Sequence, residues 1–146
     1  MGSEGQGGWY GGAMGINYLA VIAAALVSFL LGGPWYSDAV FKKAWMRAAG
    51  RAGETPQPGQ KHPAQVFGIS FVFALIAALV LALWLGPNPP LGFAVGRGLM
   101  AGAGLVATSF GINYLFSARS MVLWLIDAGY HVVQFALFGL ILGLWH

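Results

Sequence analysis

Four long runs of apolar residues divide the chain, and each is long enough to cross a bilayer. A transmembrane helix needs about 20 mostly apolar residues. The runs cover residues 16–35, 66–86, 91–116 and 121–145. The turn at residues 86–90 (GPNPP) separates the second run from the third, because proline donates no backbone hydrogen bond and restricts the residue before it. The pattern predicts an all-α, polytopic integral membrane protein with four transmembrane helices.

The connections between the runs predict how the spans are arranged. The links after the second and third spans are only a few residues long, so each joins antiparallel neighbours. The first link, residues 36–65, is a longer loop. Residues 1–15 are rich in glycine, which predicts a flexible tail. Residues 16–146 are then a single four-helix transmembrane domain.

A short amphipathic helix is predicted at the start of the 36–65 loop. Ser37 or Asp38 can cap its first turn, and the helix extends to about Ala49. Its apolar residues share one face: Val40, Phe41, Ala44, Trp45 and Ala48. Its basic residues lie elsewhere: Lys42, Lys43 and Arg47. Such a helix lies in the membrane interface, with its basic side chains toward anionic headgroups.

The composition agrees with a lipid environment. Apolar residues make up 58% of the chain and charged residues 8%, too few to cover a water-exposed surface. Lys and Arg outside the spans occur only in the 36–65 loop and in the link after the third span. The positive-inside rule therefore predicts that both of these connections are cytoplasmic and that both termini are outside. The net charge of +3 is a topology signal, and we expect no nucleic-acid partner.

Small residues recur at intervals of four along the spans, and such residues let helices approach closely in lipid. The third and fourth spans contain the most prominent ones: Gly92, Gly96, Gly98, Gly102, Gly139 and Gly143. The main interpretation is packing within one bundle. Since a four-helix unit cannot turn every small face inward, we also expect a homo-oligomer, with the third span as its interface.

Ionisable groups within a bilayer are costly, so each is a functional candidate. The spans contain Arg97, Asp127 and His131. Four residues of the fourth span fall on one helix face: Asp127, Tyr130, His131 and Gln134. Three further polar residues lie in the same half of the membrane: Thr108, Asn113 and Tyr36. These seven side chains are predicted to form one polar pocket open to the cytoplasm.

Asp127 needs a partner at this depth. Arg97 lies near the opposite end of the third span, where it is expected to snorkel to the outer surface. Asp127 is then protonated, paired with His131 one turn on, or reached by a basic residue such as Arg47. In a functional interpretation, Asp127 and His131 form a proton relay. In a structural interpretation, they belong to a satisfied polar network that fixes helix packing.

Several other chemistries find no support in the residues. The chain has no cysteine, which excludes disulfides and thiolate sites. One aspartate and one histidine leave a metal site incomplete, and no phosphate-binding loop or nucleophile elbow occurs. We therefore expect no cofactor and no metal. The leading hypothesis is a non-enzymatic membrane protein that assembles with itself or with other membrane subunits, and the alternative is a small proton-coupled transporter or channel.

Three segments resemble a known family of bacterial membrane proteins, the one grouped as domain of unknown function 1761. They are Asn17–Val21 (NYLAV), Trp35–Ser37 (WYS) with the nearby Lys43–Met46 (KAWM), and Leu123–His131 (LWLIDAGYH). The similarity extends over nearly all of the chain after the glycine-rich tail. The resemblance implies four spans and a membrane location, and we expect that membrane to be the bacterial inner membrane. It implies no activity.

Overall fold

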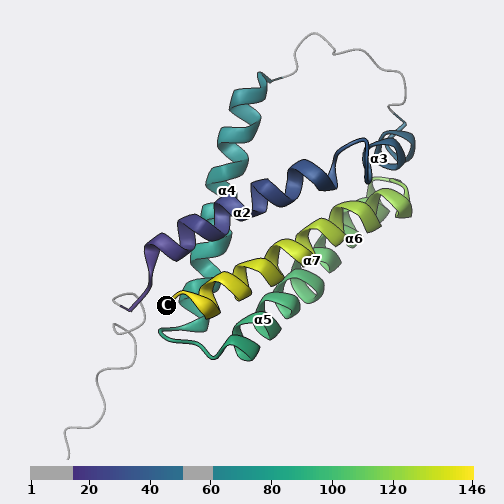
Figure 1. Ribbon diagram of the computed structural model, residues 1–146. Helices are drawn as coiled ribbons and strands as arrows, with labels where there is room; N and C mark the ends of the chain where they lie inside the picture. Colours follow the sequence, from purple (N-terminus) through teal and green to yellow (C-terminus); the bar gives the residue numbers. More distant parts are fainter. Residues whose placement is uncertain (1–14, 51–60) are drawn as a thin grey trace, which may run out of the picture.

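The computed structural model describes residues 15–50 and 61–146. Four helices in these ranges are long and apolar enough to cross a membrane: Tyr18–Trp35 (α2), Pro63–Leu85 (α4), Leu91–Phe116 and Met121–Leu144 (α7). A short helix, Lys42–Ala48 (α3), follows the first span (Figure 1). The predicted all-α class and the four predicted spans are confirmed. The predicted tail, apart from Gly15, lies outside the described residues.

The ends of two spans differ from their predicted positions because of local capping. α2 begins at Tyr18, since the Asn17 side chain accepts a hydrogen bond of 3.1 Å from the backbone nitrogen of Ala20. α4 begins at Pro63, three residues earlier than predicted. Proline is favoured at the first helical position, where its missing N–H costs nothing. The preceding residue, His62, accepts a hydrogen bond from the backbone nitrogen of Ala64 at 3.2 Å.

The third span is not a uniform α-helix. It consists of Leu91–Leu99 (α5), a π-helical segment at Met100–Ala107 (η1) and Thr108–Phe116 (α6). A π-helix forms i→i+5 hydrogen bonds, so it takes more residues per turn than an α-helix. In a uniform α-helix, Gly98 and Tyr114 would be about 4.4 turns apart and would lie on nearly opposite faces. With η1 between them, both face α7.

Side chains satisfy backbone carbonyls in and beside η1. The Thr108 hydroxyl donates to the carbonyl of Gly104 at 2.8 Å. From α7, the indole nitrogen of Trp124 donates to the carbonyl of Ala107 at 2.9 Å. Backbone polar groups at membrane depth must be satisfied within the protein, because lipid offers no partner. These bonds stabilise an irregular segment whose carbonyls would otherwise be unsatisfied in lipid.

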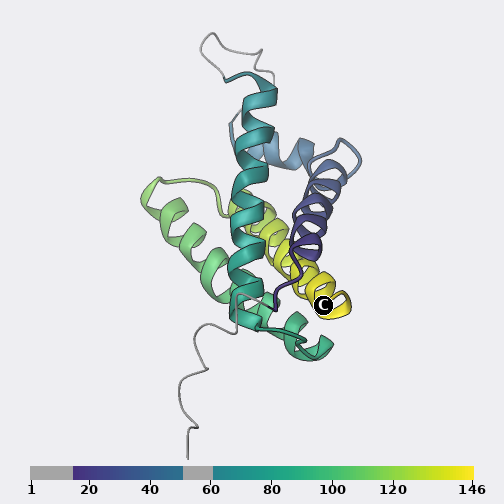
Figure 2. The ribbon, with the colours of Figure 1, turned by 90° about the vertical axis from the view of Figure 1, so that its left-hand side faces the viewer.

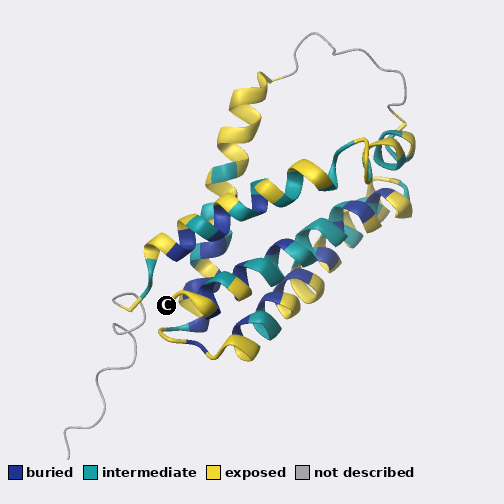
Figure 3. Ribbon diagram, viewed as in Figure 1, coloured by how far each residue is buried: buried dark blue, intermediate teal, exposed yellow. Residues whose placement is uncertain are grey.

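α7 is the central helix, and it packs against each of the other described helices. The apolar core lies at one end of the bundle, where Val21 and Leu81 meet Phe138 and Leu142. The start of α2 and the end of α7 lie at this same end (Figure 1). At the other end α4 diverges from α7 (Figure 1), and its first turns project beyond the other helices (Figure 2). Residues 61–70 are all exposed (Figure 3). The bundle is therefore tight at one end and open at the other.

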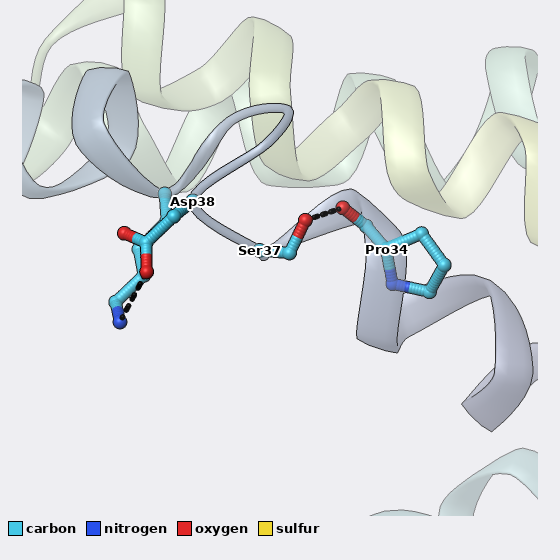
Figure 4. A network of polar contacts seen from close by, with 4 residues as sticks. Pro34, Ser37 and Asp38 are labelled. Atoms are coloured by element: carbon cyan, nitrogen blue, oxygen red, sulfur yellow. Dashed lines mark hydrogen bonds and ion pairs between the residues drawn. The ribbon is translucent and has the colours of Figure 1, made fainter.

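The start of α3 differs from the prediction. The Ser37 hydroxyl donates to the carbonyl of Pro34 at 2.7 Å, and Asp38 pairs with Lys42 at 3.5 Å (Figure 4). Neither residue caps α3, which begins at Lys42 without a side-chain cap. Ser37 instead helps to close the last turn of α2, because that turn contains the proline. The basic residues Lys42, Lys43 and Arg47 are exposed.

Four of the six predicted interface glycines lie inside the bundle: Gly98, Gly102, Gly139 and Gly143. These glycines lie where α5 and η1 pack against α7. A Cβ on any of them would press against the partner helix. The main interpretation, packing within one bundle, therefore holds for these four glycines, and they are not available as an oligomer interface. Gly92 and Gly96 face open space instead.

We predict that Gly139→Ala destabilises the bundle. The new Cβ would lie 2.8 Å from the carbonyl carbon of Ala94, so two helix backbones must separate. Overpacking of this kind costs about 1–3 kcal/mol. Unfolding in detergent micelles, followed by circular dichroism, should show the loss. Gly68→Ala is the matched control, because a Cβ there meets open space; equal stability of the two variants would contradict the prediction.

Candidate functional site

The Asp127 carboxylate accepts three hydrogen bonds from other side chains. Its Oδ1 accepts from the Tyr36 hydroxyl at 2.7 Å and from the Trp45 indole nitrogen at 3.0 Å. Its Oδ2 accepts from the Tyr114 hydroxyl at 2.5 Å. The donors come from the end of α2, from α3 and from α6. We call Asp127, Tyr36, Trp45 and Tyr114 the aspartate cluster.

Local sequence explains how the first two donors reach Asp127. α2 ends at Trp35 after a Gly-Gly-Pro sequence, and the next residue, Tyr36, caps it by donating its backbone N–H to the carbonyl of Gly32 at 3.1 Å. Trp45 lies on the apolar face of α3, which packs against α7. A second tie joins the same elements, since the Trp35 indole donates to the carbonyl of Ile126 at 3.0 Å.

The aspartate cluster compensates a carboxylate that is partly buried. A buried charge is very costly unless it is paired or hydrogen-bonded. Hydrogen bonds to a charged group contribute about 1.5–3 kcal/mol each, more than bonds between neutral groups. Burial, and then the bond to Asp127, raises the pKa of the Tyr36 hydroxyl above its ordinary value. Tyr36 therefore stays protonated and remains a donor at neutral pH.

The basic partners that the sequence suggested for Asp127 bond elsewhere. Arg47 Nε donates to the carbonyl of Lys43 at 3.3 Å. His131 Nδ1 is 2.8 Å from Gln134 Oε1. Across residues 15–50 and 61–146, no hydrogen bond or ion pair joins Asp127 to a basic side chain. Tyrosine and tryptophan donors take the place that we expected a basic side chain to fill.

Arg97 lies at the opposite end of the bundle from Asp127. Its guanidinium carbon is 4.9 Å from the centroid of the Phe93 ring and 5.6 Å from that of Trp84. An arginine over aromatic rings is typical of the membrane interface, where rings and long cationic side chains gather. Arg97 is therefore no part of the site.

A second polar group lies one turn further along α7, beside a cavity of about 720 Å³. The cavity lies between α2, α4, η1 and α7, on the open side of the bundle. The His131 ring packs between Phe110 and Tyr130, with centroids 4.9 and 5.1 Å away. The Tyr130 hydroxyl donates to the carbonyl of Ser28 at 2.9 Å. Four residues of the predicted pocket line this cavity: Tyr36, Tyr130, His131 and Gln134.

The single predicted pocket is therefore two groups that share Tyr36, which bonds to Asp127 and also lines the cavity. Asp127 belongs to the aspartate cluster and does not line the cavity. Thr108 and Asn113 belong to neither, which corrects their assignment. Thr108 is exposed and bonds to backbone carbonyls of η1. Asn113 is exposed because the π-helical segment rotates it away from α7 and brings Tyr114 there in its place.

Sequence reasoning missed Trp45 and Tyr114 as site residues. Trp45 had a usable signal, because a tryptophan on the apolar face of a short helix after the first span can turn its N–H toward a neighbouring acceptor. Tyr114 had none, since its orientation depends on η1.

Comparison with known proteins identifies one family. The model of the family described as "Protein of unknown function (DUF1761)" matches residues 19–143. The matched range includes the aspartate cluster and the residues that line the cavity. No curated protein and no solved structure matches the chain.

We predict that Asp127→Asn loosens α3 and destabilises the protein. The amide nitrogen would face a donor, so at least one of the three bonds is lost, at a cost of roughly 1.5–3 kcal/mol. Hydrogen exchange should speed up at the backbone amides of residues 42–49, and the unfolding temperature in detergent should fall. The control is Asp38→Asn, which removes only the exposed pair with Lys42 and should change stability little. Unaltered exchange in α3 of the Asp127 variant would contradict a structural role for the cluster.

Proposed function

We propose that this chain, which belongs to the DUF1761 family, is a non-enzymatic, multi-pass protein of the bacterial inner membrane that assembles with copies of itself. The observation that carries the proposal is a row of small residues on the third span that points away from the bundle. Three glycines form this outer face: Gly92, Gly96 and Gly104.

The outer face has the geometry that helix association in lipid requires. A Cβ added at Gly92, Gly96 or Gly104 would meet nothing within 4 Å, so each backbone is open to a neighbour. Helices associate in membranes by close approach at such positions, because lipid removes most of the hydrophobic drive between them. The inner glycines of the same span are already occupied by α7. Gly92 and Gly96 are therefore the part of the predicted interface that is left for a second subunit, and Gly104 extends the same face.

The aspartate cluster supports the non-enzymatic part of the proposal. A general acid or base must exchange a proton with a substrate. Both oxygens of Asp127 are engaged by Tyr36, Trp45 and Tyr114. This arrangement favours a group that fixes the positions of α2, α3 and α6 around α7.

The exposed basic residues of α3 support an orientation. Lys42, Lys43 and Arg47 lie at the end of the bundle opposite to the start of α2. By the positive-inside rule, that end is cytoplasmic and both termini are outside. The same residues would contact anionic lipid headgroups, so the bilayer is itself a partner of the protein.

We predict that Gly96→Leu shifts the purified protein from oligomer to monomer, because the leucine holds the two backbones apart. Native mass spectrometry in a mild detergent measures the shift, and the unfolding temperature of the monomer should stay unchanged. The matched control is Gly68→Leu, at a glycine of α4 that also faces open space. A wild-type protein that is monomeric, or that is recovered only with a different membrane protein, would contradict self-assembly; the second outcome would identify an accessory subunit.

Proton-coupled transport is the second candidate, and one observation favours it. His131 lines the cavity and lies one helical turn from Asp127. For this function, protons must pass between the two side chains. In liposomes, Asp127→Asn should then abolish a pH-driven flux that Asp38→Asn leaves intact. An undiminished flux through a folded Asp127→Asn protein, verified by circular dichroism, would contradict the relay.

A further inference from the structure

The cavity has the size and lining of a binding site for a small molecule. Its volume of about 720 Å³ lies within the range of known ligand sites, roughly 300–1,000 Å³. Aromatic side chains from three helices form much of its wall: Phe29 from α2, Phe67 and Phe73 from α4, and Phe135 from α7. It lies where the N-terminal half of α4 diverges from α7 (Figure 1). An apolar space of this size at membrane depth is open to molecules dissolved in the bilayer.

Two polar side chains in the wall offer one hydrogen-bond acceptor and one donor. Gln134 Oε1 can only accept, so the proton of their 2.8 Å bond belongs to His131 Nδ1. In a neutral imidazole, Nε2 is then an acceptor. The amide nitrogen of Gln134 is a donor. No other hydrogen bond of the described residues uses either nitrogen, and neither is sealed inside the protein.

The charge of the lining restricts the ligand further. None of the residues that line the cavity is Asp, Glu, Lys or Arg. A charged headgroup at this depth would lack a counter-charge and would be costly to bury. Asp127 does not compensate for this, because it lies outside the cavity and its oxygens are engaged by the aspartate cluster.

We propose that the cavity binds a neutral lipid with a hydroxyl head group. The hydroxyl donates to His131 Nε2 and accepts from the Gln134 amide, and the apolar body of the lipid lies against the phenylalanine wall. One group that both donates and accepts fits this pair of nitrogens. A hydrocarbon would leave both nitrogens without partners, and an ether would leave the histidine nitrogen without one. The site is separate from the outer glycine face, so it does not depend on self-assembly.

Binding of three probes to the purified protein tests the head group. The probes are 1-dodecanol, dodecyl methyl ether and dodecane, and native mass spectrometry or ligand-dependent thermal shift measures their affinity. The alcohol should bind about tenfold more tightly than the ether, the effect of one hydrogen bond. An alkylphenol of similar length shows whether the hydroxyl sits on a chain or on an aromatic ring. Equal affinity for all probes, or no binding, would overturn the proposal.

Two sets of variants locate the site. His131→Phe combined with Gln134→Leu removes both hydrogen-bonding partners together, so neither is left buried without the other. The affinities for the alcohol and the ether should then become about equal, while the protein stays folded. Ser70→Phe fills the cavity from an exposed position on α4 and should weaken every probe at least tenfold. Ile69→Phe is its control, since Ile69 is exposed on the same helix and does not line the cavity. An alcohol preference that survives in the double variant, or cross-links between Ser70→Cys positions of two copies, would assign the cavity to another occupant.

Discussion

The structure depends on one carboxylate that is held within the membrane domain by neutral donors. Asp127 lies about 10 Å along α7 from its first residue, where few partners for a charge are at hand. Three side chains from three other elements converge on it. Each of those elements must be in place for its bond to form. The cluster therefore links the end of α2, the interfacial helix and the last part of the third span to one point on the central helix.

Two features of the third span make that convergence possible. Near its start, Gly98 and Gly102 let its backbone lie directly against α7. Further on, a uniform α-helix would have turned Tyr114 away from α7. The π-helical segment delays the rotation, so Tyr114 reaches Asp127. The irregularity is stabilised by Thr108 and Trp124, which occupy carbonyls that lipid cannot satisfy.

The same physics explains what the sequence predicts and what it does not. Spans and turns follow from hydrophobic length and from proline, which are local properties. The face shared by Asp127, Tyr130, His131 and Gln134 follows from helical periodicity, and Tyr36 follows from the end of α2. Asn113 is predicted from its depth in the membrane alone, and whether Asn113 or Tyr114 faces α7 depends on η1, which interrupts the helical periodicity. No residue type marks η1 in advance, because π-helical hydrogen bonds depend on how the span packs against its neighbours.

The split of the polar face on α7 follows from the shape of the bundle. At the Asp127 level, α3 and α6 close around α7 and supply enough donors to satisfy the carboxylate. One turn further on, α4 diverges from α7 and nothing in the described chain replaces it. His131 and Gln134 there bond to each other and still have one nitrogen each to offer. This fold engages both oxygens of its aspartate and leaves a donor and an acceptor open beside an apolar cavity. The aspartate fixes the helices, and the histidine and glutamine are free to bind a molecule from the membrane.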